Sequence, residues 1–267
     1  MIDRPQHLPD FASPPVDEVF LGVQFAPPRD YSSVVAKDIW GLFQKGYPRI
    51  QEHQALDPTF ETFGGLSPQP KAQFRVGTAP LRGRLWFISE EQNDLVQFQE
   101  DRFFLNWRKR PTLEPYPRFE VIADTFRSHL NSLEKFFIEG LHSGLDINQA
   151  EISYINIIPV KSFAEAGDYL RSWPPAIDIE NLNLQFSEVI HDASKKPYAR
   201  LVHEVQSVVT IDTKQRAIRF SLTFRGKPSG NQIADAMVFL CAGRERIVTR
   251  FSELTTERAH LAWERKQ

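Results

Sequence analysis

Hydrophobic residues recur at two spacings along this chain, and the two spacings predict strands and helices in alternation. Residues 18–25, 85–88, 95–107 and 152–160 carry apolar side chains at alternate positions or in short runs, which is typical of strands. Residues 119–140 instead repeat apolar side chains at steps of three and four, which predicts a long amphipathic helix. The expected buried stripe of this helix is Ile122, Phe126, Leu130, Leu133 and Phe137.

The first half contains three further predicted elements. Ser32 or Ser33 is suited to cap a helix running to about residue 51, although Gly46 and Pro48 favour an earlier end. Residues 56–72 are rich in proline and glycine, and we expect them to form the most mobile loop. A short strand is predicted at 73–76, followed by a hairpin of 85–88 with 95–107 that turns at 91–94.

The second half is predicted to repeat this order. A proline-rich connection around Trp173 takes the place of the first helix, and a strand at 182–190 follows it. Residues 200–211 and 217–225 predict a second hairpin. One long helix is expected over 232–263, with a kink where Gly243 interrupts its apolar stripe.

These elements predict an α+β fold made of two similar halves. We expect an N-terminal arm at 1–15, a first α+β half at 16–146 and a second at 147–267, packed together as one unit. Each half would contribute a strand, a helix or loop, further strands with a hairpin, and a long helix. Antiparallel sheet with the long helices on one face would suit this order, as in TATA-binding-protein-like or helix-grip-like arrangements.

Composition narrows the class of protein. The formal net charge of −2 over 267 residues provides no global basic field to attract nucleic acid or anionic membranes. The single cysteine, Cys241, excludes an internal disulfide and fits a reducing compartment. Because no signal-peptide or membrane-helix pattern is visible, we expect a cytoplasmic protein without membrane association.

Catalytic and cofactor motifs are missing from the sequence. It contains no nucleophile elbow, phosphate-binding loop or dinucleotide fingerprint, and its seven histidines lack metal-ligand spacing. The adjacent carboxylates Glu90 and Glu91 fall at a predicted turn, and Glu100 and Asp101 point to opposite faces of a predicted strand. His203 alternates with apolar neighbours and is interpreted as a core histidine. We therefore predict no catalytic residue, no cofactor and no metal site.

One basic and aromatic region is a candidate for nucleic-acid or partner binding. Arginine and aromatic side chains together provide what a single strand needs for stacking and phosphate contacts. A simpler interpretation is a strand whose aromatics fill the core while its basic end reaches solvent. The candidate residues are Arg102, Arg108, Lys109, Arg110, Tyr116 and Arg118.

The last predicted helix offers a second candidate surface. Its near-heptad apolar stripe would pack on the core, but Leu261 and Trp263 lie at its extreme end. We expect these two side chains to form an exposed patch for a partner.

Four segments occur in an order that resembles a known family. These are Pro14–Val19, the strand ending in Asn106-Trp107-Arg108, Tyr116-Pro117 before a helix, and Phe251 with Leu254-Thr255. The chain thereby resembles an uncharacterised, sporadically distributed family of bacterial proteins with no assigned activity. Such families often occur in defence or toxin–antitoxin-like gene neighbourhoods. At Ala242-Gly243 the sequence departs from an Ala-His pair expected for the family, so a role built on that histidine would be absent.

The sequence thus predicts a non-enzymatic interaction or regulatory subunit, one suited to a bacterial defence-like module. Its partner would be a protein, either a second copy or a neighbouring gene product. Two alternatives remain open. The basic region from Arg102 to Arg118 could bind nucleic acid. A helix-grip-type domain could instead hold a small ligand or act as an enzyme.

Overall fold

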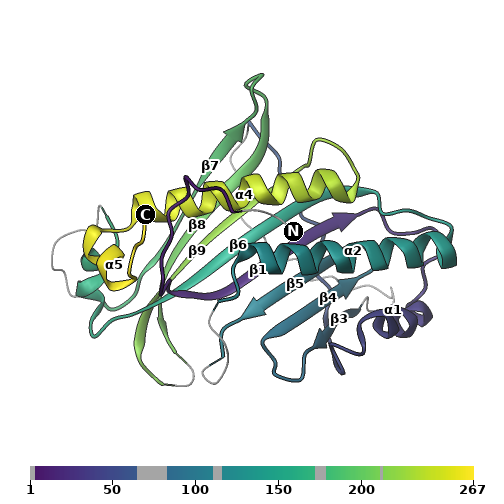
Figure 1. Ribbon diagram of the computed structural model, residues 1–267, viewed down its shortest axis with the longest axis horizontal. Helices are drawn as coiled ribbons and strands as arrows, with labels where there is room; N and C mark the ends of the chain where they lie inside the picture. The colour runs from purple at the N-terminus through teal and green to yellow at the C-terminus, as the bar shows by residue number, and fades with distance from the viewer. Residues whose placement is uncertain (1–3, 65–82, 111–115, 172–178, 211–212) are drawn as a thin grey trace.

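The computed structural model has an α+β architecture with one large antiparallel sheet and two long helices on one of its faces (Figure 1). The structure describes residues 4–64, 83–110, 116–171, 179–210 and 213–267. The predicted α+β class is confirmed at this level. Within the described residues no helix is long and apolar enough to cross a membrane.

Nine strands form the sheet in the order β2-β3-β4-β5-β1-β6-β9-β8-β7, and every adjacent pair is antiparallel. Strands β1 and β6 lie side by side at the centre, so each half of the chain supplies one side of the sheet. The strands are β1 (Val16–Phe25), β2 (Arg49–Gln54), β3 (Gly83–Ile88), β4 (Asp94–Gln99), β5 (Arg102–Arg108), β6 (Ile147–Pro159), β7 (Asn183–His191), β8 (Pro197–Val209) and β9 (Arg216–Gly226).

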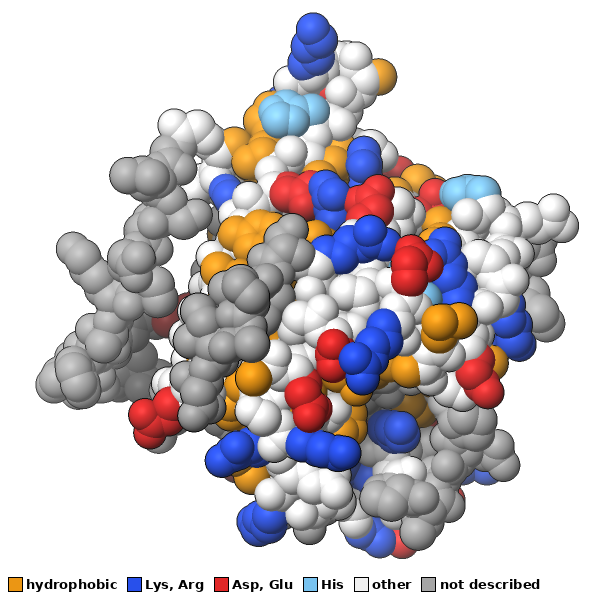
Figure 2. All heavy atoms as spheres, turned by 90° about the vertical axis from the view of Figure 1, so that its left-hand side faces the viewer, with side chains coloured by type: hydrophobic (Ala, Val, Ile, Leu, Met, Phe, Trp, Pro, Cys, Tyr) orange, Lys and Arg blue, Asp and Glu red, His pale blue; other side chains and the backbone are white. Residues whose placement is uncertain are grey.

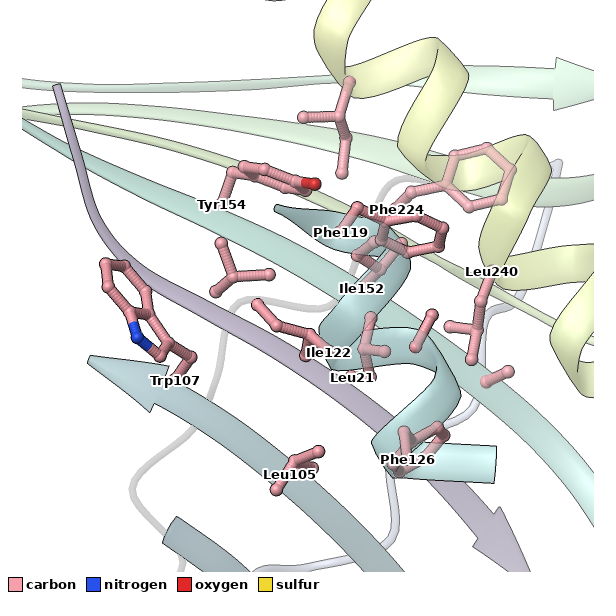
Figure 3. Close-up of a cluster of buried hydrophobic side chains, with 14 of the residues drawn as sticks. Leu21, Leu105, Trp107, Phe119, Ile122, Phe126, Ile152, Tyr154, Phe224 and Leu240 are labelled. Carbon is pink, nitrogen blue, oxygen red and sulfur yellow. The ribbon is translucent and has the colours of Figure 1, made fainter. Parts of the chain in front are cut away.

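The helices pack on one face because their apolar stripes match that of the sheet. All five residues predicted for the stripe of the long helix α2 (Phe119–Leu141) are buried. In the core, α2 and the second long helix cover side chains such as Leu21, Leu105 and Ile152 (Figure 3). The remaining helices are η1 (Ser33–Val35), α1 (Ala36–Phe43), η2 (Phe163–Glu165), α3 (Ala166–Tyr169), α4 (Ile233–Leu254) and α5 (Glu257–Ala262).

Three predicted elements have different bounds in the structure. The first helix ends at Phe43, and the segment predicted to continue it is the edge strand β2. The predicted strand at 95–107 is two strands, β4 and β5, joined by a tight turn at Glu100 and Asp101. The predicted strand at 73–76 and the connection at Trp173 lie outside the described residues.

Gly243 does not interrupt the last long helix. Helix α4 is continuous through this residue, and an added Cβ would lie 2.6 Å from Phe224 Cδ1 and 2.8 Å from Ile152 Cγ2. The glycine therefore allows the helix backbone to approach β6 and β9 closely.

The predicted helix over 232–263 breaks instead at Thr255, which has an extended backbone. Thr256 caps the new helix α5 by accepting a hydrogen bond from the Ala259 amide. The chain turns back there, so Trp263 is only 7% exposed and packs 5.2 Å from Phe251. The expectation of an exposed pair is thus wrong for Trp263, whereas Leu261 is 81% exposed.

The N-terminal arm lies against the C-terminal end of the chain. Backbone hydrogen bonds join Asp10 to Gln267 and Lys266, and Ala12 to Glu264. Phe11 is buried between Phe251 and Trp263. The arm therefore closes one end of the helix-covered core.

Candidate functional site

The sheet has two chemically different faces. The β1–β5 register places Val19 beside Trp107 and Leu21 beside Leu105 on the helix-covered face. On the opposite face, the same register places Glu18 beside Arg108. Further pairs along this face are Phe20 with Asn106 and Gln24 with Arg102. No helix or strand among the described residues packs on this second face, which we call the polar face.

A loop crosses part of the polar face and is held by three glutamines. Gln99 exchanges hydrogen bonds with the backbone of Leu56, and Gln24 does the same with Thr59. Gln149 donates to the Thr59 carbonyl and accepts from the Glu61 amide. The three glutamine side chains are buried in β1, β4 and β6. Each one forms hydrogen bonds with backbone groups of the loop, which explains why a polar residue is found at these buried strand positions. The portion of the predicted mobile loop that the structure describes is thereby tied to the sheet.

On the half of the polar face formed by β8 and β9, two arginines are neutralised by one carboxylate. Glu61 Oε2 lies 2.7 Å from Arg200 Nε, and Glu61 Oε1 lies 2.6 Å from Arg225 Nη2. Glu151 faces the same arginine at 3.8 Å, and burial raises the pKa of its carboxyl. Arg200 and Arg225 are thus already paired, whereas Arg219 on the same face of β9 donates to the neutral Gln206 Oε1 at 3.2 Å.

On the other half, a chain of hydrogen bonds crosses four strands. Arg84 Nη1 donates to Gln97 Oε1 at 3.1 Å, and Gln97 Nε2 donates to Asn106 Oδ1 at 2.8 Å. Asn106 Nδ2 then donates to Glu18 Oε1 at 2.6 Å. The relay fixes the orientation of both amides and holds Arg84 without a direct carboxylate partner.

Two guanidinium groups meet the indole of Trp86 beside this relay. The Cζ atoms of Arg84 and Arg108 lie 5.5 and 5.9 Å from its ring centroid, and the His53 ring lies 3.9 Å away. We call Arg84, Trp86 and Arg108 the Trp86 cluster. Among the described residues, Arg108 forms no ion pair and no side-chain hydrogen bond, and the buried Nε atoms of Arg84 and Arg108 and the Nε1 atom of Trp86 lack an acceptor.

The electrostatics of the Trp86 cluster favour an anion. Burial lowers the pKa of Arg84, with a further contribution from Arg102. Burial also lowers the pKa of Arg108, with Arg110 adding to this effect and Glu18 opposing it. Both groups stay charged because a guanidinium group keeps its proton far above neutral pH. The carboxylate that acts on Arg108 is Glu18, and it already accepts a hydrogen bond from Asn106.

The structure disperses the basic residues predicted from the sequence. Arg102 is 3% exposed and forms a bidentate pair with Asp101, at 3.0 and 3.2 Å. Lys109 is exposed, and Arg110 donates to the Gln92 carbonyl in the β3–β4 turn. Only Arg108 of this group belongs to the Trp86 cluster.

Tyr116 and Arg118 lie on the helix-covered side of the sheet. The Tyr116 hydroxyl is 3.0 Å from that of Tyr154, and its ring packs 5.3 Å from Trp107. Arg118 is paired with Asp10 at 3.0 Å. The predicted set therefore does not form one continuous surface.

Other candidate residues have structural roles. His203 is fully buried, stacks on Phe186 at 4.3 Å and has its Nε2 2.9 Å from Glu188 Oε1, as expected of a core histidine. Burial raises the pKa of the half-buried Cys241 thiol, which disfavours a nucleophilic thiolate. Glu90 lies in an exposed turn and pairs with Arg49. No group of three potential metal ligands occurs among the described residues.

The end of the molecule at α5 carries charges of both signs. Figure 2 shows Lys and Arg side chains interspersed with Asp and Glu over this surface. Representative pairs are Arg250 with Glu253 at 2.7 Å and Arg258 with Asp168 at 2.8 Å. Such alternation provides no single-sign field, so this end is a poor candidate for polyanion binding.

Comparison with known proteins adds no functional assignment. No protein-family model and no curated protein matches the chain. The crystal structure of the di-domain ARO/CYC StfQ from the steffimycin biosynthetic pathway aligns with 88% of this chain and 98% of that chain. The sequence identity is 10% and the TM-score is 0.18, a value that supports no argument from this similarity.

Proposed function

We propose that the protein is a non-enzymatic binding protein whose polar sheet face binds single-stranded nucleic acid at the Trp86 cluster. The observation that carries this proposal is the pair of guanidinium groups held on one indole without a carboxylate partner of their own. Phosphate oxygens would accept hydrogen bonds from the terminal nitrogens of these guanidinium groups, because the three Nε donors are themselves buried.

The neighbouring side chains suit a single strand better than an isolated anion. Phe20 in β1 lies half-buried on the same face, and its ring packs 6.1 Å from the buried ring of Phe104. Aromatic rings on an open sheet face stack nucleobases, while arginines contact the phosphates between them. The three strand spacings from β3 to β1 cover roughly 14 Å, which is room for about two or three nucleotides.

We further propose that the sheet-and-helix arrangement is of the TATA-binding-protein-like or helix-grip-like kind expected from the sequence. In sheet-based nucleic-acid readers the strands contact the nucleic acid directly. A double-stranded probe is therefore a necessary comparison, because a saddle-like sheet would favour the duplex whereas stacking on aromatic side chains requires unpaired bases.

The test measures fluorescence anisotropy of a labelled oligothymidylate at low and moderate salt. Arg108→Ala should weaken binding about tenfold and reduce the slope of log affinity against log salt by about 0.7. Because Arg108 lacks a hydrogen-bond partner within the described residues, this substitution leaves no group newly unsatisfied. The matched control is Arg246→Ala, which removes an exposed arginine from α4 on the other side of the sheet. Equal losses in both variants, or no binding at low salt, would contradict the proposal.

A protein-interaction role, the first expectation from the sequence, is the second candidate. Strand β7 is at one edge of the sheet, and Leu184 and Phe186 on it are 45% and 42% exposed. An edge strand with exposed apolar side chains is suited to pairing with another chain. The regulatory, defence-like role suggested by the family resemblance would use this edge.

Native mass measurement of charge variants separates the two predicted interfaces. Leu184→Glu should convert any assembly to the 30.8 kDa monomer, whereas Leu261→Glu on α5 should not. Dissociation by Leu261→Glu alone would instead support the surface predicted from the sequence. A monomer in every variant would remove this second candidate.

A further inference from the structure

His260 lies where the N-terminal arm meets the C-terminal end of the chain. It belongs to the short helix α5 and is 2% exposed. Its ring lies 5.4 Å from that of Phe11, the arm residue that also packs against Phe251 and Trp263. Phe11 and Arg265 form an isolated antiparallel bridge. We call Phe11, His260 and Arg265 the terminal clasp, because they hold the arm beside the C-terminal segment (Figure 1).

Both ring nitrogens of His260 have a fixed partner. Thr255 Oγ1 donates to the Phe251 carbonyl at 2.7 Å, so it accepts a hydrogen bond from His260 Nε2 at 2.8 Å. An arginine side chain can only donate, so Arg265 Nη1 donates to His260 Nδ1 at 2.9 Å. This pattern requires a neutral imidazole with its proton on Nε2.

A second proton on the ring would break the contact with Arg265. Nδ1 would become a donor facing the donating guanidinium, and two positive charges would meet at nitrogens that are 2.9 Å apart. Glu257 Oε2 lies 3.7 Å from the same nitrogen, but Glu257 is 76% exposed and pairs with Arg171 at 2.9 Å. Arg265 is exposed, so its guanidinium can turn away into solvent.

The charged groups that act on His260 come from several elements. Glu257 belongs to α5, Arg265 follows it and Arg171 follows α3, while α4 presents the Ser252 carbonyl and the arm presents an aromatic ring. Burial lowers the pKa of His260, Arg265 lowers it further, Glu257 opposes this, Arg171 adds to it and the Ser252 carbonyl opposes it. The closed clasp therefore binds the proton less tightly than a released histidine does, and acid favours the open form.

We infer that His260 is a pH-sensitive switch whose protonation opens the terminal clasp and frees the N-terminal arm. The closed form is favoured fully above the ordinary histidine pKa of 6.5 and loses this advantage as the pH falls below it. Opening removes Phe11 from Phe251 and Trp263, which exposes an apolar surface on α4 and the C-terminal segment. This inference does not depend on the proposed nucleic-acid binding.

Hydrogen exchange of the intact protein, read by mass spectrometry, measures how often the arm opens. The Asp10 and Ala12 amides donate to the Gln267 and Glu264 carbonyls and report the arm, while amides of β9 report global opening. From about pH 7.5 to about pH 5, after correction for intrinsic exchange, protection of the arm should fall about tenfold relative to β9. One proton taken up below the ordinary histidine pKa shifts the equilibrium by at most about tenfold for each pH unit. Exposed carboxylates remain charged over this range.

Two substitutions remove the switch and keep the hydrogen bonds. His260→Gln supplies a donor and an acceptor but takes up no proton. Arg265→Gln donates to the neutral ring or, with its amide turned over, accepts from the charged one. In both variants the protection of the arm should change by less than about twofold over the same pH range.

His7→Gln is the matched control. His7 lies in the arm, 3.8 Å from a Glu245 carboxylate oxygen, and a charged His7 would hold the arm rather than free it. This variant should therefore keep the loss seen in the wild type. If His260→Gln does not close the clasp at neutral pH, Arg265→Gln decides alone. Constant protection of the wild-type arm, a loss that Arg265→Gln leaves unchanged, or a loss that His7→Gln abolishes would overturn the inference.

Discussion

Substituting alanine for two helical glycines should change stability in opposite directions. Gly243 in α4 faces the sheet, where an added Cβ would lie 2.6 and 2.8 Å from side-chain carbons of Phe224 and Ile152. Gly140 in α2 is exposed, and its nearest neighbour to an added Cβ is Phe136 at 3.9 Å, an ordinary contact. Each substitution gains helix propensity, with a smaller gain at Gly140 near the end of α2, so a loss of stability at Gly243 reports the packing of α4.

The magnitudes follow from two competing terms. Replacing glycine by alanine inside a helix is worth about 1 kcal/mol in propensity. At position 243 the new methyl group must move the helix or the Phe224 ring by roughly 1 Å to reach the usual carbon–carbon separation, and overpacking of this kind costs about 1–3 kcal/mol or somewhat more. We expect Gly243→Ala to lose about 1–2 kcal/mol and Gly140→Ala to gain up to about 1 kcal/mol, the gain being reduced near a helix end.

Urea unfolding followed by far-ultraviolet circular dichroism measures both free energies. In thermal scans the loss at position 243 should lower the melting temperature by about 2–6 °C for a chain of this size. An increase in stability for both variants would refute the close approach of α4 to β6 and β9. A loss for both would mean that propensity is not the controlling term at the exposed site.

Three further predictions concern pH and the terminal clasp. Burial lowers the pKa of His129 to about 4, so the unfolded chain binds its proton more tightly and stability should fall by up to about 3 kcal/mol as pH drops from 6.5 to 4; His129→Gln should flatten this part of the stability profile. Burial, with a contribution from Glu91, raises the pKa of Asp94 to about 6; stability should therefore decrease as pH rises from about 4 to 6, and Asp94→Asn should add about 1–2 kcal/mol at pH 7. Phe11→Ala should destabilise by about 3 kcal/mol and expose the arm to limited proteolysis, whereas Phe60→Ala, at a site 54% exposed, should do neither.

The sequence predicted those elements whose hydrophobic pattern is strong. Helix α2 was placed within one residue because its stripe is regular over five buried positions. Strand β2 was mistaken for helix because it is an edge strand with no buried residue, so no alternation distinguishes it. The break between α4 and α5 was missed because no glycine or proline marks it. Thr256 is the N-cap of α5, but a threonine also occurs inside helices, so its presence in the sequence does not show that one helix ends there and another begins.

The site depends on contacts that a single sequence does not contain. Alternation places Arg84 and Trp86 on one face of β3 and Arg108 on a face of β5, but it does not say that the two faces coincide. Register and strand order bring these residues together across β4. Pairing likewise decides which arginines are available, because Glu61 neutralises Arg200 and Arg225 from more than a hundred residues away in the chain. The basic residues predicted from the sequence therefore include Arg108 but not Arg84 or Trp86, the other two members of the Trp86 cluster.

Photocrosslinking is the measurement that tests the nucleic-acid proposal most directly. A single-stranded oligonucleotide carrying photoreactive thymidines would be bound at low salt, irradiated, and mapped on the protein by mass spectrometry. The account predicts crosslinks at Trp86 on β3 and at the half-buried Phe20 on β1, and it predicts that both are lost when Trp86→Ala is introduced without a change in folding. Crosslinks confined to α2 or α4, or a pattern that Trp86→Ala leaves unaltered, would contradict binding on the polar face.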